Sequence, residues 1–298
     1  MSKTIKPFIK WVGGKTQILE QVSKNFPNTM TNYHEPFVGG GSVLLHVLEL
    51  QKENKLHIEY KVYAYDTNIV LINTYKAIQN NLDSLVKNMT EFVNKYNNCE
   101  DIKLEKVSFN PETEEEGLLS KENYYYWLRK TFNTLDKNTI KACALFIVLN
   151  KLCFRGIYRE GPNGFNVPYG HYKNPSIFSE IHLKKIQELI KDVVFNVSSF
   201  EISMRDITDN DFVYFDPPYA PETSTSFVKY NKDGFNLEQH KLLFKMINES
   251  NYKFVMSNSN EKLVLDNFKN YTIQKVECKR RVNSKKPQST TMEVLIYN

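Results

Sequence analysis

The sequence predicts an α/β fold with a mostly parallel sheet, because short apolar segments alternate along the chain with helical patterns. The strand-like segments are rich in β-branched and aromatic residues and have the length of buried strands. They are residues 60–65, 193–197, 212–215 and 252–257. Apolar residues at helical spacing lie over 18–26, 69–75 and 237–247. Such alternation is typical of a parallel sheet covered by helices on both faces.

The middle of the chain departs from this alternation. Residues 82–96 and 121–152 have helical patterns, the second broken around 134–138, and an acidic polar loop is expected over 111–117. Residues 155–174 are rich in Gly, Pro and Asn, which favours a loop or hairpin. We therefore expect a helical insertion over 77–190. Residues 271–276 and 292–297 then predict a terminal hairpin.

The composition is that of a globular protein with a mild excess of positive charge. Hydrophobic residues make up 41% of the 298 residues and charged residues 24%, which excludes a disordered or collagen-like chain. The formal net charge of +5 permits a polyanionic partner without requiring one, since a lysine-rich protein of any function has the same balance. Aromatic residues, 13% of the chain, fill cores or offer stacking faces for bases.

Neither the cysteines nor the N-terminus indicates export. The four cysteines form no CxxC pair, so a zinc ribbon or redox motif is disfavoured and a reducing compartment is expected. The N-terminus lacks an apolar run like that of a signal peptide, and no segment approaches a membrane span of about 18 apolar residues. We expect a cytoplasmic protein, or one in a nucleoid or viral factory, that is not secreted.

The first motif is a glycine turn at residues 10–16, which read Lys-Trp-Val-Gly-Gly-Lys-Thr. A phosphate-binding P-loop would need glycine at position 9, where the chain has Ile9, so that interpretation fails. What remains is a turn that lets a ligand approach the backbone, flanked by an aromatic residue and a cation. An ordinary helix-capping turn has the same pattern.

The second motif is Glu-Pro-Phe-Val-Gly-Gly-Gly-Ser at residues 35–42, followed by an apolar helix. Three glycines between a strand and a helix let a ligand pack against the main chain and the helix N-terminus. Asp66 follows the next predicted strand, where an acidic residue commonly binds ribose hydroxyls. The pair supports a nucleoside-containing cofactor, although a tight turn and a strand-end aspartate also occur without one.

The third and most specific motif is Asp-Pro-Pro-Tyr at residues 216–219, placed by an apolar strand at its carboxyl end. The prolines fix the backbone and remove N–H donors, so the Asp216 carboxylate and the Pro217 carbonyl present acceptors. Two acceptors suit an exocyclic amine, which has two N–H donors. Tyr219 adds a flat face on which a base can stack.

Taken in this order, the motifs resemble those of the Dam-like family of DNA adenine methyltransferases, whose targets are of the GATC or CATG type. Residues 165–168 with Gly170, and Asn150 and Lys151 before residues 154–159, match its recognition region. The resemblance extends from about residue 6 to the C-terminus. It implies a Rossmann-like, seven-stranded, doubly wound sheet with an inserted target-recognition domain. The methyltransferase domain would comprise residues 1–76 and 191–298, and the insertion residues 77–190, with a DNA-reading hairpin at about 154–170.

The resemblance also implies S-adenosylmethionine as methyl donor, double-stranded DNA as partner and a role for each matching residue. The catalytic residues would be Asp216, Pro217, Pro218 and Tyr219. The cofactor would contact Trp11, Lys15, Glu35, Pro36, Phe37, Gly39, Gly41, Ser42, Asp66, Phe200 and Asp216. DNA would contact Lys10, Phe154, Arg155, Ile157, Arg159, Asn166, Pro168 and Tyr230.

Within the hairpin, Phe154 matches an intercalating aromatic and Arg159 a guanine reader, which suits bidentate contacts to O6 and N7. The chain has Arg155 where relatives often have Asn, and Glu-Gly-Pro follows Arg159, so GATC and CATG both remain as targets. A basic cluster over 275–286 has two interpretations, phosphate contact or a solvated hairpin surface. The acidic run 112–116 should lie away from DNA or be flexible, and residues 220–234 read as a mobile loop over the site.

The expected reaction needs neither a metal nor a covalent intermediate. Flipping the adenine out of the duplex exposes its amine, and the acceptors at 216 and 217 would favour a tetrahedral nitrogen whose lone pair is available. Methylation of cytosine N4 and a DNA-binding relative without catalysis are the alternatives. A cognate restriction endonuclease is a possible functional partner, and the expected state is a monomer or weak dimer.

Overall fold

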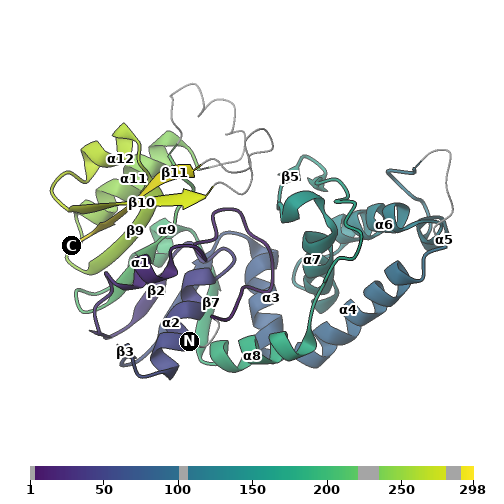
Figure 1. Cartoon of the computed structure of the whole chain (residues 1–298), viewed down its shortest axis with the longest axis horizontal. Coiled ribbons are helices and arrows are strands. Elements are labelled where there is room, and N and C mark those ends of the chain that lie inside the picture. Colours follow the sequence, from purple (N-terminus) through teal and green to yellow (C-terminus); the bar gives the residue numbers. More distant parts are fainter. Residues whose placement is uncertain (1–3, 101–106, 221–234, 280–289) are drawn as a thin grey trace.

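A seven-stranded sheet forms the centre of the computed structural model, which describes residues 4–100, 107–220, 235–279 and 290–298 (Figure 1). Its strands in spatial order are β10 (Thr272–Lys279), β11 (Thr290–Tyr297), β9 (Lys253–Ser259), β8 (Phe212–Phe215), β2 (Tyr33–Glu35), β4 (Val62–Asp66) and β7 (Val193–Val197). The five strands from β9 to β7 are parallel, and β11 pairs antiparallel with β9 and β10. The predicted α/β fold with a terminal hairpin is confirmed.

The chain adds strands in one direction from β2, through β4 to β7, and then continues on the other side of β2 with β8 and β9. β2 is therefore the switch point of the sheet. The carboxyl ends of parallel strands at such a switch point are where open α/β sheets bind ligands. The glycine-rich turn at 36–41 follows β2, Asp66 ends β4 and Asp216 follows β8. The chain topology therefore brings the second and third motifs to the same edge of the sheet.

The predicted strand boundaries agree with β7 and β8 and differ elsewhere. The strand expected over 60–65 begins only at Val62, and Tyr60 before it is 74% exposed. β2 carries no local signal, because two of its three residues are the polar His34 and Glu35, yet all three are buried. Because strands are recognised in a sequence by their apolar residues, a strand with two buried polar residues is not detected.

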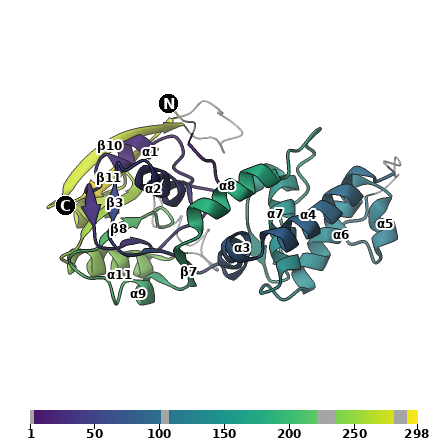
Figure 2. The ribbon, with the colours of Figure 1, turned by 90° about the horizontal axis from the view of Figure 1, so that it is seen from below.

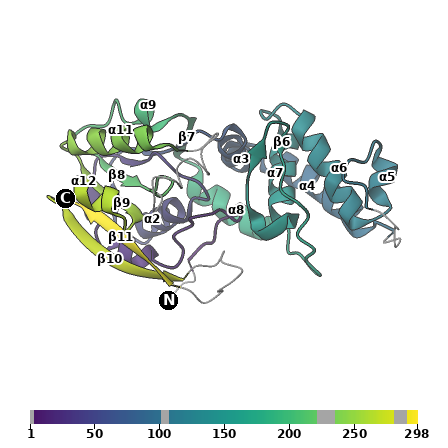
Figure 3. The same cartoon turned by 90° about the horizontal axis from the view of Figure 1, so that it is seen from above.

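Helices cover both faces of the sheet. Figures 2 and 3 show α1 (Leu19–Ser23) and α2 (Ser42–Lys52) along one face and α9 (Phe200–Ser203) and α11 (Leu237–Asn248) along the other. Val264 of α12 (Lys262–Asn267) belongs to a buried cluster, separate from the main core, that also contains Phe244 and Ile247 of α11. The helical pattern predicted over 18–26 is longer than α1, although Phe26 beyond it is buried.

A second group of elements lies beside the sheet (Figure 1). It comprises α4 (Leu82–Asn97), α5 (Glu114–Leu118), α6 (Lys121–Thr134), α7 (Ile140–Leu152), the 3-10 turn η1 (Phe154–Gly156), β5 (Glu160–Gly161) and β6 (Gly164–Phe165). β5 and β6 pair antiparallel as the short hairpin that the sequence predicts. The remaining short strands, β1 (Thr29–Met30) and β3 (His57–Ile58), pair parallel outside the main sheet.

The acidic segment predicted as a loop over 111–117 contains a helix, so that expectation is wrong. The Thr113 hydroxyl accepts from the Glu116 N–H at 3.3 Å and caps α5. Three glutamates occupy the first turn, where negative charge is favourable near the helix N-terminus. Lys95 holds Glu114 at 2.9 Å from the neighbouring α4.

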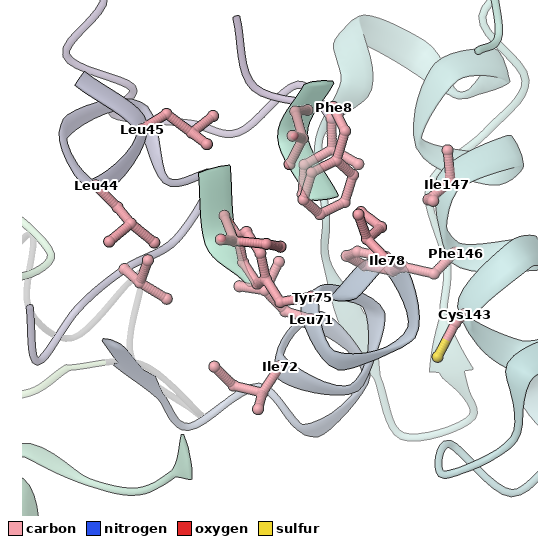
Figure 4. Close-up of a cluster of buried hydrophobic side chains, with 14 of the residues drawn as sticks. Phe8, Leu44, Leu45, Leu71, Ile72, Tyr75, Ile78, Cys143, Phe146 and Ile147 are labelled. Atoms are coloured by element: carbon pink, nitrogen blue, oxygen red, sulfur yellow. The ribbon is translucent and has the colours of Figure 1, made fainter. Parts of the chain in front are cut away.

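α3 (Ile69–Asn80) joins the sheet to the second group of helices. Figure 4 shows Tyr75 and Ile78 of α3 between Leu44 and Leu45 of α2 on one side and side chains of α7 on the other. α8 (Glu180–Ile190) packs against α2, α3 and α4. One continuous core therefore runs from the sheet into the helical region. No helix within the described residues has the length and apolar character that a membrane span requires.

Candidate active site

Lys15 is a buried cation at the point where the three motifs meet. Its Nζ lies 2.7 Å from Asp216 Oδ1 and donates to the Gly13 carbonyl at 2.6 Å. The same Nζ lies 4.7 Å from the centroid of the Tyr219 ring, a cation–π distance. The Lys15 backbone N–H donates to Ser42 Oγ at 3.0 Å, which ties the first turn to the start of α2. The structure thus assembles residues that are far apart in the chain.

The glycine-rich turn after β2 packs directly against Trp11. A Cβ on Gly39 would lie 2.8 Å from Trp11 Cδ1, and one on Gly40 would lie 2.9 Å from Trp11 Cβ. Gly41 has φ +70°, a conformation that favours glycine, just before α2 begins at Ser42. The three glycines are therefore needed for close approach and for the backbone turn.

Two acidic residues flank this turn. Both oxygens of Asp66 accept backbone N–H bonds, from Gly39 at 3.1 Å and from Asn68 at 2.9 Å. Burial raises the pKa of Asp66 above its usual value, and these N–H donors oppose the rise. Glu35 is buried and accepts from the Tyr33 hydroxyl at 2.8 Å; burial raises its pKa well above the usual range.

The predicted aromatic contacts of the cofactor form a buried cluster. Phe200 is 3% exposed at the start of α9. Its ring stacks on Phe37 at a centroid distance of 5.9 Å and packs against Phe235 at 5.5 Å. Pro36, which directly precedes Phe37 in the chain, is also buried. The structure brings Phe37 and Phe200 together, a contact that the sequence did not predict, with the Phe200 ring inside the cluster.

The Asp-Pro-Pro-Tyr segment leaves β8 with polar groups around it. Burial raises the pKa of Asp216, while the adjacent Lys15 ammonium opposes the rise and stabilises the carboxylate. The Tyr219 hydroxyl donates to Glu293 Oε2 of β11 at 2.6 Å. The Pro218 carbonyl lies 3.0 Å from Nε2 of the buried His240 on α11. The motif is thus held from three directions by residues of other elements.

The DNA-reading segment predicted at 154–170 presents several side chains to the surface. Phe154 is 45% exposed, and the Arg155 guanidinium lies over its ring at 5.1 Å. Arg155 has φ +58°, an unusual conformation for a residue other than glycine, and its N–H donates to the Tyr172 hydroxyl at 2.9 Å. A strained, exposed turn is a common arrangement in a binding element.

Other residues of this segment form the predicted hairpin around Arg159. Its Nε donates to Asn166 Oδ1 at 2.7 Å, and both side chains are exposed. The Pro168 carbonyl accepts from the Phe154 N–H at 2.8 Å, so the two ends of the segment are joined. Ile157 is half-buried against the main core.

The predicted DNA-reading segment and the first glycine turn contact each other. Trp11 stacks on Tyr158 at a centroid distance of 5.8 Å. Asn150 is buried; it accepts from the Lys10 N–H and donates to the Lys10 carbonyl, both at 2.8 Å, and donates to the Gly156 carbonyl at 3.1 Å. The turn predicted to bind the cofactor and the segment predicted to read DNA are thus held together by these contacts.

Lys10 and Lys151 place positive charge near this junction. The Lys10 ammonium lies over the Tyr172 ring at 4.5 Å. Burial, with a smaller effect of Lys10, lowers the pKa of Lys151 to about 8. Tyr230, and the basic residues Arg280, Arg281, Lys285 and Lys286, lie outside the described residues.

Sequence reasoning gave no role to four residues that complete the site. Glu293, His240, Asn150 and Tyr158 contact the predicted residues but lie in ordinary strand, helix and loop patterns. Asn150 is matched to the recognition region of the family and Tyr158 lies within the matched segment 154–159, and these are the available signals. Glu293 and His240 are recognised only by their contacts with distant elements.

The arrangement suits transfer of a group to an amine. At the end of β8, the acceptor Asp216 lies beside the Lys15 ammonium and near the Tyr219 ring. The glycine turn and the start of α2 follow the neighbouring β2, and the Asp66 carboxylate ends β4. Within the described residues no three His, Cys, Asp or Glu side chains gather as a metal site would require.

Comparisons with known proteins agree with this arrangement. The family model described as D12 class N6 adenine-specific DNA methyltransferase matches residues 11–282. The type II methyltransferase M.MjaIII of Methanocaldococcus jannaschii is 36% identical, over 99% of each chain. M1.LlaDCHI of Lactococcus lactis subsp. cremoris, also named a type II methyltransferase, is 31% identical over 99% of this chain and 95% of its own.

A DNA adenine methylase of Escherichia coli K12 is 28% identical over 95% of this chain and 91% of its own. The resemblance that the motifs indicate is therefore confirmed over nearly the whole chain, and adenine N6 rather than cytosine N4 is the acceptor of the family. The chain belongs to the D12 class of N6 adenine-specific DNA methyltransferases.

Proposed function

We propose that the protein uses S-adenosylmethionine to methylate N6 of an adenine flipped out of a short palindromic DNA target of the GATC or CATG type. The observation that carries this proposal is the convergence of Asp216, Tyr219 and Lys15 beside the glycine turn after β2. Residues 1–76 and 191–298 would form the methyltransferase domain, and residues 77–190 the target-recognition domain.

The residues around β2 and β4 fit S-adenosylmethionine, which supplies an electrophilic methyl group on its sulfonium. Gly39 and Gly40 lack the Cβ atoms that would collide with Trp11, so the backbone of the turn lies close to that ring, and no side chain in the described part caps the start of α2. Backbone N–H groups are thus left for a carboxylate. Asp66 retains a lone pair on each oxygen for ribose hydroxyls, and Trp11, Lys15, Glu35 and Ser42 border the same turn.

The Asp-Pro-Pro-Tyr segment would hold the target adenine by its amine. The Asp216 carboxylate and the Pro217 carbonyl accept the two N–H bonds, which favours a tetrahedral nitrogen with an available lone pair. Because the amine gains positive charge as it reacts, the fixed carboxylate stabilises that charge without reorganisation. Lys15 keeps the carboxylate ionised, and Tyr219 offers its face to the base.

The hairpin would bind and read the duplex. Phe154 is exposed and suited to fill the space of the flipped base, and Arg159 is exposed and oriented by Asn166 for a guanine. The remaining residues of the proposed DNA contact lie near these two; they are Lys10, Arg155, Ile157, Asn166 and Pro168.

Two further parts of the proposal concern the setting of the protein. Relatives named type II methyltransferases support a cognate restriction endonuclease as functional partner. An enzyme acting on DNA would work in the cytoplasm or in a nucleoid or viral factory.

Methyl transfer in vitro tests this function. Purified protein, S-adenosylmethionine labelled in its methyl group and unmethylated duplex DNA are incubated, and the DNA is digested to nucleosides. We expect labelled N6-methyladenine with the wild type and none with Asp216→Ala. Tight DNA binding without any label in DNA would refute the proposal.

A further inference from the structure

The hydroxyl of Tyr219 is anchored by a carboxylate that lies on a different strand. Glu293 belongs to β11, where it pairs with Ser259 of β9, and its Oε2 accepts from the Tyr219 hydroxyl at 2.6 Å. Burial first, then the negative charges of Asp216 and Glu293, raise the pKa of Tyr219 well above its usual value. The phenol therefore stays protonated and donates across the neutral range.

The backbone of the Asp-Pro-Pro-Tyr segment is fixed without Glu293, whereas the ring of Tyr219 is not. Two prolines restrict the chain up to Pro218, and His240 contacts the Pro218 carbonyl. The ring of Tyr219 still has two side-chain torsions. The Lys15 ammonium lies at one face, and the hydroxyl bond to Glu293 restrains its tip.

The carboxylate is itself held by the sheet. β11 lies between β9 and β10, so Glu293 has a paired strand on each side. The thiol of Cys278 on β10 faces Glu293; burial, followed by the influence of this carboxylate, raises the thiol pKa to about 12. Cys278 is therefore a neutral thiol beside the carboxylate, and the backbone of Glu293 is fixed by a paired strand on each side.

We propose that Glu293 is a positioning residue that fixes the plane of the Tyr219 ring on which the target base stacks. The inference rests on the proposed function, since it concerns the same base-binding face. A ring fixed in advance reduces the cost of ordering the flipped base for reaction. Glu293 acts through Tyr219 and touches neither the base nor the methyl donor.

The test compares Glu293→Ala, Glu293→Gln and Tyr219→Phe with the double variant Tyr219→Phe/Glu293→Ala. Glu277→Ala is the matched control, because Glu277 is an exposed glutamate on the neighbouring β10. The measurements are the single-turnover rate of methylation and the affinity for S-adenosylmethionine. A third is the emission of 2-aminopurine placed at the target adenine of a duplex.

We expect Glu293→Ala and Tyr219→Phe each to slow single turnover about tenfold, the factor associated with a hydrogen bond to a charged group. The double variant should be about as slow as either single one, because both remove the same bond. Emission of the flipped 2-aminopurine should rise in all three variants, since an unrestrained ring quenches it less. Cofactor affinity should change by less than about twofold.

Glu293→Gln keeps an acceptor oxygen and should restore the rate to within about threefold of the wild type. Independent effects that multiply in the double variant would overturn the inference. So would a Gln variant as slow as Ala, or a wild-type rate in Glu293→Ala. A wild-type protein that methylates no DNA would instead refute the proposed function, so the two failures are distinct.

Discussion

The ammonium of Lys15 lies 2.7 Å from the carboxylate of Asp216, so the first glycine motif supplies the counter-charge of the Asp-Pro-Pro-Tyr motif. Lys15 is buried and the Asp216 side chain is 20% exposed; burial raises the pKa of Asp216, and Lys15 opposes that rise. An ionised carboxylate accepts N–H bonds more strongly than a protonated carboxyl group, and only the ionised form offsets the positive charge that the reacting amine gains. Lys15 therefore links the turn proposed to bind the cofactor to the reactivity of the proposed base-binding site.

Removal of this cation should change the pH dependence of methylation. Without Lys15, burial and the negative charge of Glu293 act unopposed and raise the pKa of Asp216 further. The carboxylate is then protonated at a higher pH as the solution is acidified. For Lys15→Ala we expect the acidic limb of kcat/KM against pH to move to higher pH, together with a lower plateau. Lys184→Ala, which removes an exposed lysine of α8, should leave the limb unchanged. An unshifted limb in Lys15→Ala would contradict the role of the ion pair.

The Arg159–Asn166 pair should set the preference at one base pair of the target. Arg159→Ala should relax that preference by about 1–3 kcal/mol, the usual value of a bidentate contact to guanine. Asn166→Ala should relax the same base pair to a smaller extent, because Asn166 orients the guanidinium through a 2.7 Å bond. Methylation rates on a set of single-substituted duplexes measure both effects, and Arg205→Ala is the control. Relaxation at different base pairs would show that the two residues do not act together.

Asn150 should contribute to stability out of proportion to its size. It makes three hydrogen bonds to backbone groups of Lys10 and Gly156. At about 1 kcal/mol for each bond, Asn150→Ala should lower the free energy of unfolding by about 3 kcal/mol. Urea denaturation measures this change. Asn88→Ala, in which an exposed amide bonds within α4, should change stability by less than about 0.5 kcal/mol. If both substitutions lowered the free energy of unfolding equally, the three bonds of Asn150 would not contribute as expected.

His34 should make the protein less stable in acid. Burial lowers the pKa of His34 to about 4, although Asp211 at 3.5 Å opposes this. Between this value and about 6.5 the unfolded chain binds more protons at this residue than the folded one, so this contribution to stability rises with pH. The full contribution is of the order of 3 kcal/mol, present above pH 6.5 and lost as the pH falls towards 4.

The difference in unfolding free energy between wild type and His34→Gln, measured from pH 4 to 7, isolates this contribution from those of Glu35, Asp66 and Asp216. We expect the difference to grow as the pH rises to about 6.5 and then to level off. A difference that is constant with pH would mean that His34 binds protons equally in both states.

Local patterns in the sequence were sufficient to predict much of this molecule. The glycine turn, Asp66 and the Asp-Pro-Pro-Tyr segment each follow a strand, and their short-range spacing indicated a ligand site at one sheet edge. The structure brings them together as expected. The helix-strand alternation likewise predicted the α/β fold, although β2, with its buried His34 and Glu35, escaped the hydrophobic pattern.

Contacts between distant elements could not be predicted in this way. Glu293 is half-buried in the first part of β11, where exposed and half-buried residues alternate as in an ordinary strand. His240 lies on a helix, where a buried histidine has no distinctive pattern. Their partners, Tyr219 and Pro218, are identified only once the sheet is assembled. The α5 helix was missed because its cap, Thr113, precedes a run of glutamates that resembles a polar loop.

Modification-aware sequencing of host DNA tests the central claim most directly. The gene is expressed in a host free of DNA methylation, beside the Asp216→Ala variant, and every modified base is located in its sequence context. The account predicts N6-methyladenine within one short palindromic motif of the GATC or CATG type in the wild-type sample only. N4-methylcytosine in place of N6-methyladenine, or an unmodified genome in cells that contain folded wild-type protein, would contradict it.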